Sequence, residues 1–480
     1  MFAPVVNVAP RDGRGGFWGV PMSWRIGTTW LALLALAGCT SRPSGSCEKD
    51  TQCSGSEVCF EGKCTTMKER ERILQERKDA ERPKVCEDKD KDGFRAGADC
   101  PAGERLDCDD NDAQAAPGKA EVCDERDNNC DGRNNEGLRG CVQTLFGLPV
   151  PGHPELKLDN PRGLLYDPAG FLLVADNHHV WKISLSDGRA EVLAGSHLSN
   201  FADGAAAEAR FSYPNGMARL ADGSLALADC KNNCLRRIGP DGRVSTLAGQ
   251  CSNLTKDIGQ FADGPASAAR FYCPSDVAPG PDGALYIVDQ LNARVRRLKD
   301  GQVATLAGIG PAEVVEGEGQ IGFLDGPGDQ ARFNDPQAVL VDSRGGIFVS
   351  ESFNCRIRKV SPGKDGKFEV STFVGDSDTK LGIGGYVDGP AKAVKFNYPH
   401  GMAFDAQGNF ILADTGNATI RMVTPAGAAR TLYGKAGEAQ CRDGPIAQAR
   451  FQSPMDVAPG PDGSLFVSDT LCHRVRWIVP

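Results

Sequence analysis

The residues best suited to chemistry in this chain are aspartates at alternate positions. Asp88, Asp90 and Asp92 are followed by Gly93, and Asp99 stands at the twelfth position of the loop that Asp88 opens. Carboxylates at positions 1, 3, 5 and 12 of such a loop converge on one point, and the glycine permits the sharp turn between them. Hard oxygen ligands in this number favour Ca²⁺ over softer metals. The spacing therefore predicts a structural calcium site.

Two further sets of acidic and amide side chains follow the first. The first of these lacks the glycine, and the second has Leu138 at its twelfth position. Residues 86–141 carry a net charge of −8 out of −9 for the whole chain, so the acidity is local. The alternative to metal binding is a solvated acidic segment held together by disulfides. The candidate ligands of the two sets are Asp107, Asp109, Asn111, Asp127, Asn129 and Asp131.

The order of acids, asparagines and cysteines from Cys123 to Gly137 resembles the metal-binding motif of secreted bacterial proteins, particularly myxobacterial ones. The resemblance implies that this segment binds a metal. The motif usually ends in Asp-Glu-Gly, whereas this chain has Asn135-Glu136-Gly137. Because of this difference, the sequence does not identify the last metal ligand of the motif.

The first residues predict export and a lipid anchor. A basic stretch that starts at Met22 precedes an apolar run over residues 30–37, which is too short to span a bilayer as a helix. Leu36-Ala37-Gly38-Cys39 matches the bacterial lipobox, whose cysteine is acylated. We expect residues 1–39 to form a lipoprotein signal peptide with Met22 as the true start, and Cys39 to anchor the protein, most simply in the outer membrane of a Gram-negative bacterium. The alternative is an ordinary signal peptide with a chance cysteine.

The 18 cysteines indicate an oxidising compartment, because no Cys/His spacing matches a zinc finger. Residues 40–65 hold four of them in a small module, residues 66–85 predict a charged helical linker, and residues 86–141 form the Cys- and Asp-rich segment. Further along the chain, Cys355 has no evident partner. The remaining disulfide candidates are Cys230, Cys234, Cys251, Cys273, Cys441 and Cys472.

The elements that position these residues come from a repeat. The unit from Tyr213 to Gly249 contains short apolar runs separated by Asp-Gly turns, a hairpin signal. One such meander cannot bury both faces, so it needs copies as neighbours. The four strands expected in this unit are Met217–Leu220, Leu225–Ala228, Leu235–Ile238 and Val244–Ala248.

Six copies of the unit occur. Each opens at a proline and carries an apolar run that ends in an acid, but only five have a closing strand downstream. The missing strand stands upstream as Val142–Gly147, which predicts a ring closed by the N-terminal strand. We therefore expect an all-β, six-bladed β-propeller over residues 142–480. The opening prolines are Pro161, Pro214, Pro274, Pro336, Pro399 and Pro454, and the acids are Asp176, Asp229, Asp289, Glu351, Asp414 and Asp469.

The sequence pattern of the unit is Asp-Gly-Pro, then Ala-Arg-Phe, then the opening proline, then Val-Ala-Asp-x-x-Asn-x-x-(Ile/Val)-Arg. It resembles the NHL-repeat propellers of bacterial and animal extracellular proteins. The resemblance covers roughly 340 residues and implies the fold, whereas propellers host unrelated activities.

Features present in every unit are expected to be structural. The acids and the asparagines after them should form Asx turns, and the Asp-Gly connections between blades should share one face with the acid loops. The short Asp-Gly turns should lie on the other face. Because long loops carry function, a ligand should bind the long-loop face.

Enzyme chemistry is weakly supported. The strongest candidate is a zinc lyase that resembles the peptidyl-hydroxyglycine amidating lyase, whose histidines follow the opening proline on several inner strands. A catalytic zinc needs about three protein ligands, and here only one of these positions is a histidine. We therefore predict no enzyme, with a lyase or lactonase as the alternative. The six positions hold Arg162, Asn215, Ser275, Gln337, His400 and Met455.

The acidic, exported character of the chain and the lack of a basic stripe exclude nucleic acid as a partner. We expect a surface-anchored binding or scaffold lipoprotein with a structural calcium segment. Its propeller would present an axial ring of Arg162, Asn215, Gln337 and His400 to an extracellular protein, a peptide, a glycan or a small polar ligand.

Overall fold

The computed structural model describes residues 57–60, 63–66, 72, 86, 88–96, 100, 106–109, 111–124, 126–130, 138–147, 157–252, 261–310, 322–363, 366–375 and 384–480. The chain divides into two compact units, residues 1–78 and 79–480. In the first unit, β1 (Glu57–Phe60) pairs with β2 (Lys63–Thr66) in an antiparallel hairpin. The expected signal peptide and Cys39 lie outside the described residues. No helix of the described residues is long and apolar enough to cross a membrane.

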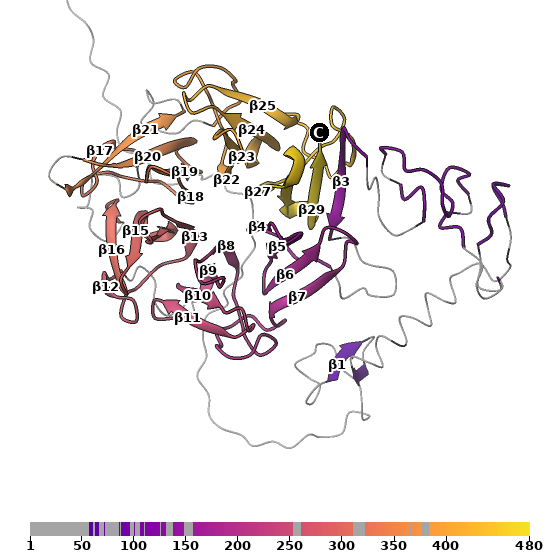
Figure 1. Ribbon diagram of the computed structural model, residues 1–480, viewed down its shortest axis with the longest axis horizontal. Helices are drawn as coiled ribbons and strands as arrows, with labels where there is room; N and C mark the ends of the chain where they lie inside the picture. The colour runs from indigo at the N-terminus through magenta and orange to yellow at the C-terminus, as the bar shows by residue number, and fades with distance from the viewer. Residues whose placement is uncertain are drawn as a thin grey trace, which may run out of the picture. The chain divides into compact units, whose positions relative to one another are not determined.

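The second unit carries six antiparallel sheets arranged as blades around an axis (Figure 1). The innermost strand of each blade lies beside the axis and the outermost strand at the rim. Blade 1 comprises β4 (Leu164–Asp167), β5 (Phe171–Ala175), β6 (His179–Ser184) and β7 (Ala190–Gly195). Blade 2 comprises β8 (Pro214–Arg219), β9 (Leu225–Asp229), β10 (Cys234–Ile238) and β11 (Val244–Ala248). Blade 3 comprises β13 (Pro274–Pro279), β14 (Leu285–Asp289), β15 (Arg294–Lys299) and β16 (Gln302–Ala307).

The other blades repeat this order. Blade 4 comprises β18 (Pro336–Val341), β19 (Ile347–Glu351), β20 (Arg356–Pro362) and β21 (Phe368–Val374). Blade 5 comprises β22 (Pro399–Phe404), β23 (Phe410–Asp414), β24 (Thr419–Val423) and β25 (Ala429–Gly434). Blade 6 comprises β27 (Pro454–Pro459), β28 (Leu465–Asp469), β29 (Arg474–Val479) and β3 (Cys141–Phe146). Two-residue strands add a fifth strand to three blades: β12 (Gly264–Pro265), β17 (Gly326–Pro327) and β26 (Gly444–Pro445).

The six-bladed propeller is confirmed, and so is the way it closes. Strand β3, from the N-terminal side, pairs with β29, with Val142 opposite Ile478 and Phe146 opposite Val475. The expected strand bounds in blade 2 hold for β11, whereas β8 starts at Pro214 instead of Met217. Five of the opening prolines begin the innermost strand of their blade, but in blade 1 this strand starts only at Leu164.

The core lies between neighbouring blades. A cluster that includes Leu173, Phe211 and Leu227 joins blades 1 and 2, and similar clusters recur around the ring. Phe211 comes from the Ala-Arg-Phe sequence, whose phenylalanines are fully buried. Burying such a side chain contributes about 1.5–3 kcal/mol. The glycine that closes each unit leaves room for the phenylalanine of the next unit. A Cβ on Gly249, which has φ +96°, would lie 2.9 Å from Phe271 Cδ2.

A buried arginine clamps each of blades 2 to 6. In blade 2, Arg236 donates to Asp229 at 2.8 Å and to Asp203 of the preceding connection at 2.7 Å. Asp229 also accepts the backbone N–H of Ser212 and the side-chain amide of Asn232. The acid thus bonds a loop amide, as expected, but in blade 2 this amide lies 17 residues before it, so the bond is not an Asx turn. Asn232 donates its side-chain N–H to the acid and to the Asn200 carbonyl. The equivalent arginines are Arg296, Arg358, Arg421 and Arg476.

Blade 1 is clamped differently. Its acid, Asp176, accepts the indole N–H of Trp181 at 2.8 Å, and His179 Nδ1 lies 3.3 Å from the same carboxylate. All three side chains are buried. Trp181 and His179 thus take the places that arginine and asparagine hold in the other blades.

Candidate functional site

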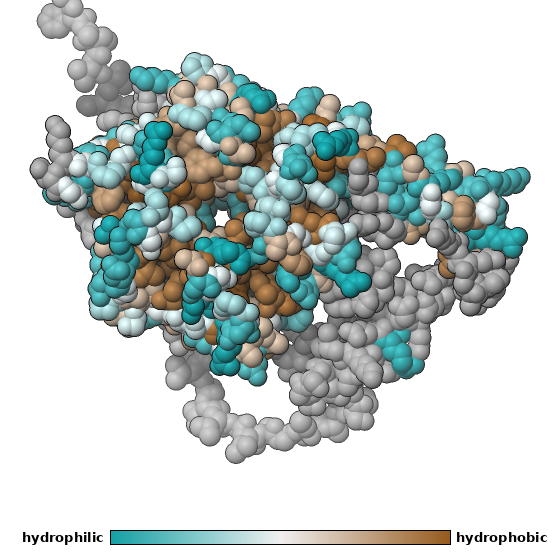
Figure 2. Space-filling model, viewed as in Figure 1, coloured by the Kyte–Doolittle hydropathy of each residue, from teal (hydrophilic) through white to brown (hydrophobic). Residues whose placement is uncertain are grey.

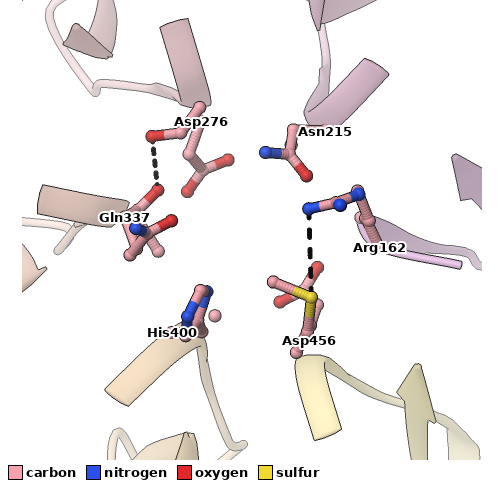
Figure 3. Close-up of a pocket in the computed structure, with 12 residues that line it drawn as sticks. Arg162, Asn215, Asp276, Gln337, His400 and Asp456 are labelled. Carbon is pink, nitrogen blue, oxygen red and sulfur yellow. Dashed lines mark hydrogen bonds between the residues drawn. The ribbon is translucent and has the colours of Figure 1, made fainter. Parts of the chain in front are cut away.

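The propeller axis holds a small polar pocket. The surface is hollowed at the centre of the ring (Figure 2), and all six residues that follow an opening proline line this hollow. The structure therefore brings Arg162, Asn215, Gln337 and His400 together from four blades, as Figure 3 shows. The pocket volume is about 40 Å³, room for roughly three waters. It can admit a head group, whereas a whole sugar or peptide must rest on the mouth.

Arg162 carries the positive charge of this pocket. Its Nη1 lies 4.0 Å from Met455 Sδ, and its guanidinium carbon lies 5.3 Å from the centroid of the Tyr213 ring. Its Nε is buried without a hydrogen-bond partner, and no carboxylate of the described residues forms an ion pair with it. Burial lowers the pKa of Arg162. An arginine nevertheless remains charged in proteins, so this charge is available to a ligand.

Among the residues that line the pocket, His400 is the single histidine. Burial, and then the nearby charge of Arg162, lowers the pKa of His400 to about 3. The imidazole is therefore neutral at physiological pH and can both donate and accept a hydrogen bond. One imidazole supplies one of the roughly three ligands that a catalytic zinc needs.

The two amide residues of the ring differ. Asn215 makes no side-chain hydrogen bond within the described part of the chain, whereas Gln337 donates its Nε2 to Asp335 at 2.7 Å. Asp335 also accepts from Gln290 Nε2 at 2.7 Å. The side chain of Gln337 is thus held by Asp335, whereas the amide of Asn215 points into the pocket and remains available to a ligand (Figure 3).

Two axial carboxylates were missed by the sequence reasoning. Asp276 accepts the backbone N–H of Val339, in the next blade, at 2.9 Å. Asp456 likewise accepts that of Leu164 at 2.8 Å. Each carboxylate also accepts the N–H of the residue that follows it. They therefore latch blade 3 to blade 4 and blade 6 to blade 1.

Burial dominates the chemistry of these latches. It raises the pKa of Asp276 to about 7 and, together with the charge of Asp276, raises that of Asp456 well above its usual value. A Cβ on Gly216 would lie 1.8 Å from Asp276 Oδ1, and one on Gly401 would lie 2.0 Å from Asp456 Oδ1. The signal for these acids was present: the eight residues from Asp276 and the eight from Asp456 are identical.

The mouth of the pocket is rimmed by the loops that follow the blade acids. Each loop is tied to the residues that precede an opening proline, as when Lys231 N–H donates to the Ser212 carbonyl and Leu291 N–H to that of Tyr272. Arg236 joins Asp229 to Asp203, but Asp203 and Gly204 lie beside the short turn around Asp241. The expectation that the Asp-Gly connections share the face of the acid loops is therefore wrong for blade 2.

Aromatic side chains stand on this rim. Lys231 Nζ lies 3.1 Å from the centroid of the Tyr213 ring. Phe353 and Tyr398 form an edge-to-face pair with centroids 5.7 Å apart, and they are 50% and 46% exposed. Exposed aromatic pairs beside a polar hollow are typical of recognition surfaces.

Disulfides fasten the same face. The structure pairs Cys230 with Cys273, Cys234 with Cys251, and Cys441 with Cys472. Cys355 lies outside these disulfides as a buried thiol that donates to the Ser352 carbonyl, and burial raises the pKa of this thiol. A thiol of this kind is protonated at neutral pH and therefore a poor nucleophile.

The acidic segment gathers three carboxylates. Oxygens of Asp88, Asp90 and Asp92 lie within 4.8 Å of one another. Asp88 accepts the N–H of Asp92 and of Gly93, each at 3.1 Å, and Lys119 Nζ lies 3.0 Å from Asp92. The backbone N–H of Phe94 lowers the pKa of Asp92. Asp99 and Asp131 lie outside the described residues.

The other acidic sets are less convergent. Asp107 lies near Cys108 and Cys130, but these two sulfurs are bonded to each other and cannot act as thiolate ligands. Asp109 accepts the N–H of Asn111 at 3.2 Å. The N–H of Asn129 donates to Glu121. Within the described part of this segment, disulfides also join Cys86 to Cys100 and Cys123 to Cys141.

Two family models match the chain. One is the metal-binding motif named Cu-binding_MopE, over residues 107–136, and the other is the NHL repeat, over residues 396–421. The propeller contains an NHL repeat. The metal-binding motif covers the second and third acidic sets and not the loop that Asp88 opens.

Curated relatives match part of the chain. SUPPRESSOR OF QUENCHING 1 of Arabidopsis thaliana is 25% identical over 249 residues, 48% of this chain and 23% of that protein. NHL repeat-containing protein 2 of Gallus gallus is 26% identical over 336 residues, 64% of this chain and 44% of that protein. Teneurin-m of Drosophila melanogaster is 24% identical over 229 residues, 43% of this chain and 8% of that protein. The match thus spans less than half the length of each relative.

A solved structure shares the fold. An auxiliary nutrient binding protein from Bacteroides thetaiotaomicron superposes with a TM-score of 0.51 at 14% identity, covering 70% of this chain and 75% of that one. At this identity the likeness shows the propeller fold alone.

Proposed function

We propose that this protein is an extracytoplasmic binding or scaffold protein whose propeller holds a polar ligand at the mouth of its axial pocket. One observation carries the proposal. Within the described residues, the acids and arginines that recur in blades 2 to 6 bond one another in the clamps. Arg162, Asn215 and His400 instead line the pocket, and their side chains make no hydrogen bond to oxygen or nitrogen among these residues. Polar groups of this kind fix the orientation of a ligand.

Binding is favoured over catalysis. His400 is a single imidazole, and Asp276 and Asp456 are occupied by backbone N–H groups of two blades each. A zinc-dependent lyase or lactonase, the alternative, would need further ligands at the axis. The solved propeller that is described as nutrient-binding is compatible with the binding proposal.

The anchor and the compartment belong to the same proposal. Disulfides such as Cys230–Cys273 form in oxidising compartments. We propose that Cys39 carries a lipid and tethers the protein to the outer membrane. Incorporation of labelled palmitate tests this, and Cys39→Ala should abolish the label.

The acidic segment is proposed to hold a structural Ca²⁺. Asp88, Asp90 and Asp92 offer converging hard oxygens, whereas the cysteines in the described part of this segment are paired in disulfides and offer no thiolate to copper. When bound, the cation would supply charge neutralisation and order.

A ligand screen tests the binding function. The full chain is scanned by thermal shift against glycans, peptides and small acids, and hits are repeated with Arg162→Ala and His400→Ala. Axial binding predicts that both variants lose the shift. Arg219→Ala is the matched control, because Arg219 is a surface arginine of β8 that pairs with Asp167. Hits that survive both axial changes would contradict the proposal.

A further inference from the structure

The charge of Arg162 is unbalanced. The five clamp arginines are each held by two carboxylates, as Arg236 is by Asp203 and Asp229. Arg162 instead has a thioether sulfur and the ring of Tyr213 as neighbours. Removing a guanidinium from water without a counter-charge is unfavourable. An anionic ligand would supply that counter-charge and therefore bind favourably beside Arg162.

A second cation stands at the same corner. Lys231 lies over the Tyr213 ring that Arg162 also approaches, and it has no acidic partner in the described part of the chain. Blades 1 and 2 thus present two cations around one aromatic ring. A carboxylate between them would receive charge-assisted hydrogen bonds, which are roughly twice as strong as neutral ones.

The axial acids do not cancel this charge. Asp276 and Asp456 each accept two backbone N–H groups, and neither forms an ion pair with Arg162 in the described residues. Burial also raises the pKa of both acids, that of Asp276 to about 7. His400 is neutral. The pocket therefore remains positive on the side of Arg162.

The other part of the rim is apolar. Phe353 and Tyr398 expose their rings, and Tyr398 stands two residues before the axial His400. The pocket admits only a head group, as its volume of about 40 Å³ requires. A ligand that fits both the small pocket and the apolar rim would place a small charged group in the pocket and an apolar group against the exposed rings.

We propose that the axial mouth binds the carboxylate end of an aromatic or aliphatic acid, with Arg162 and Lys231 holding the carboxylate and with Phe353 and Tyr398 covering the apolar group. This inference rests on the proposed binding function and names its ligand class.

Two probes that differ only in charge test the ligand class. N-acetyl-phenylalanine and N-acetyl-phenylalaninamide are titrated into the full chain by calorimetry. The acid should bind at least about 10-fold more tightly than the amide, a difference of about 1.4 kcal/mol, because hydrogen bonds to a charged group are stronger than those to a neutral group. N-acetylglycine, which lacks the ring, should bind more weakly than the phenylalanine acid.

Variants locate the site. Arg162→Met should abolish the preference for the acid, Arg162→Lys should keep part of it, and Phe353→Ala should reduce the affinity for the phenylalanine acid towards that for N-acetylglycine. Arg219→Met should bind both probes as the wild type does. The unfolding temperature of each variant is measured to show that it folds.

The outcomes separate the inference from the function on which it rests. Equal binding of acid and amide, both lost in Arg162→Met, would overturn the carboxylate class and keep the axial binding site. Absence of acid binding at millimolar concentration, or acid binding that Arg162→Met leaves unchanged, would also overturn the inference. If in addition no compound of the broader screen depends on Arg162 or His400, the binding function falls too.

Discussion

Thr144 Oγ1 donates a hydrogen bond of 2.6 Å to Asp443 across 299 residues of sequence. The other clamped blades contain the same bond within one blade and its connection, as between Thr246 and Asp203 at 3.1 Å. Strand β3 therefore makes the threonine–aspartate hydrogen bond of an outer strand, in addition to pairing with β29 as the outer strand of blade 6. The remaining equivalents are Thr305 with Asp263, Thr372 with Asp325, and Thr431 with Asp388.

Removing β3 should destabilise the propeller. Deletion of residues 1–148 exposes the edge of β29 and removes the buried side chains of Val142 and Phe146, which contribute about 3–6 kcal/mol together. Deletion of residues 1–138, with Cys141→Ser to avoid a new free thiol, should keep the closure. Thermal unfolding of the two truncations measures the difference, and equal stability would contradict closure by β3.

The repeat made most of the fold predictable. Hydrophobic alternation and Asp-Gly turns are local, so six blades and a displaced closing strand could be counted from sequence. Disulfide pairing could not, because it depends on how loops of different blades meet: Cys230 pairs with Cys273 of the next blade and not with Cys234 four residues away.

The axial site was half predictable. Sequence pointed to the residue after each opening proline, through the resemblance to the amidating lyase, whose histidines occupy these positions. The structure has a register shift at this point, for instance between Pro274 and Asp276, and between Pro454 and Asp456. Such a bulge turns two successive residues to the axis. Asp276 and Asp456 therefore join the pocket. Their identical eight-residue sequences marked them as a pair but did not place them at the axis.

The buried clamps should be costly to break. Arg236→Met leaves Asp229 buried without its counter-charge, and loss of one partner of a buried pair costs about 3–5 kcal/mol. The neighbouring Arg237 pairs with Asp222 at the surface, so Arg237→Met should cost no more than about 1 kcal/mol. Denaturant unfolding compares the two variants. Similar losses would show that the clamp does not stabilise the blade.

The axial latches predict a pH dependence of stability. Burial raises the pKa of Asp276 from 3.8 to about 7, so the folded protein holds a proton there that the unfolded chain has released. The free energy of unfolding should therefore fall as pH rises between these values, by up to about 1.4 kcal/mol per pH unit for this group. Asp276→Asn should remove its share of the slope, although the wild-type slope also contains the contribution of Asp456 in the same channel.

Calorimetric unfolding from pH 4 to pH 8 checks this slope. Asp282→Asn is the control, because Asp282 belongs to the same repeated sequence but pairs with Lys299 at the surface. Its substitution should leave the slope between pH 5 and 7 unchanged. An unaltered slope in Asp276→Asn would mean that this carboxyl is ionised in the folded state throughout the range.

The acidic segment predicts a calcium response. Asp88, Asp90 and Asp92 hold three carboxylates close together, and Lys119 offsets part of the repulsion at Asp92. A bound cation converts repulsion into coordination, and its binding free energy adds to the stability of the segment. Extracellular calcium modules bind at roughly 10⁻⁴–10⁻³ M. Residues 86–141 should therefore resist proteolysis in millimolar calcium and lose this protection with chelator.

Variants and a second metal decide the interpretation. Asp90→Ala combined with Asp92→Ala should abolish the calcium protection and leave the melting of the propeller unchanged, whereas Asp187→Ala, an exposed acid of the propeller, should alter neither. Protection by Cu²⁺ but not by Ca²⁺ would favour the copper that the name of the matched motif indicates. Protection without metal, while the Cys86–Cys100 and Cys123–Cys141 disulfides are intact, would contradict the calcium interpretation. It would favour the alternative, an acidic segment that disulfides alone hold together.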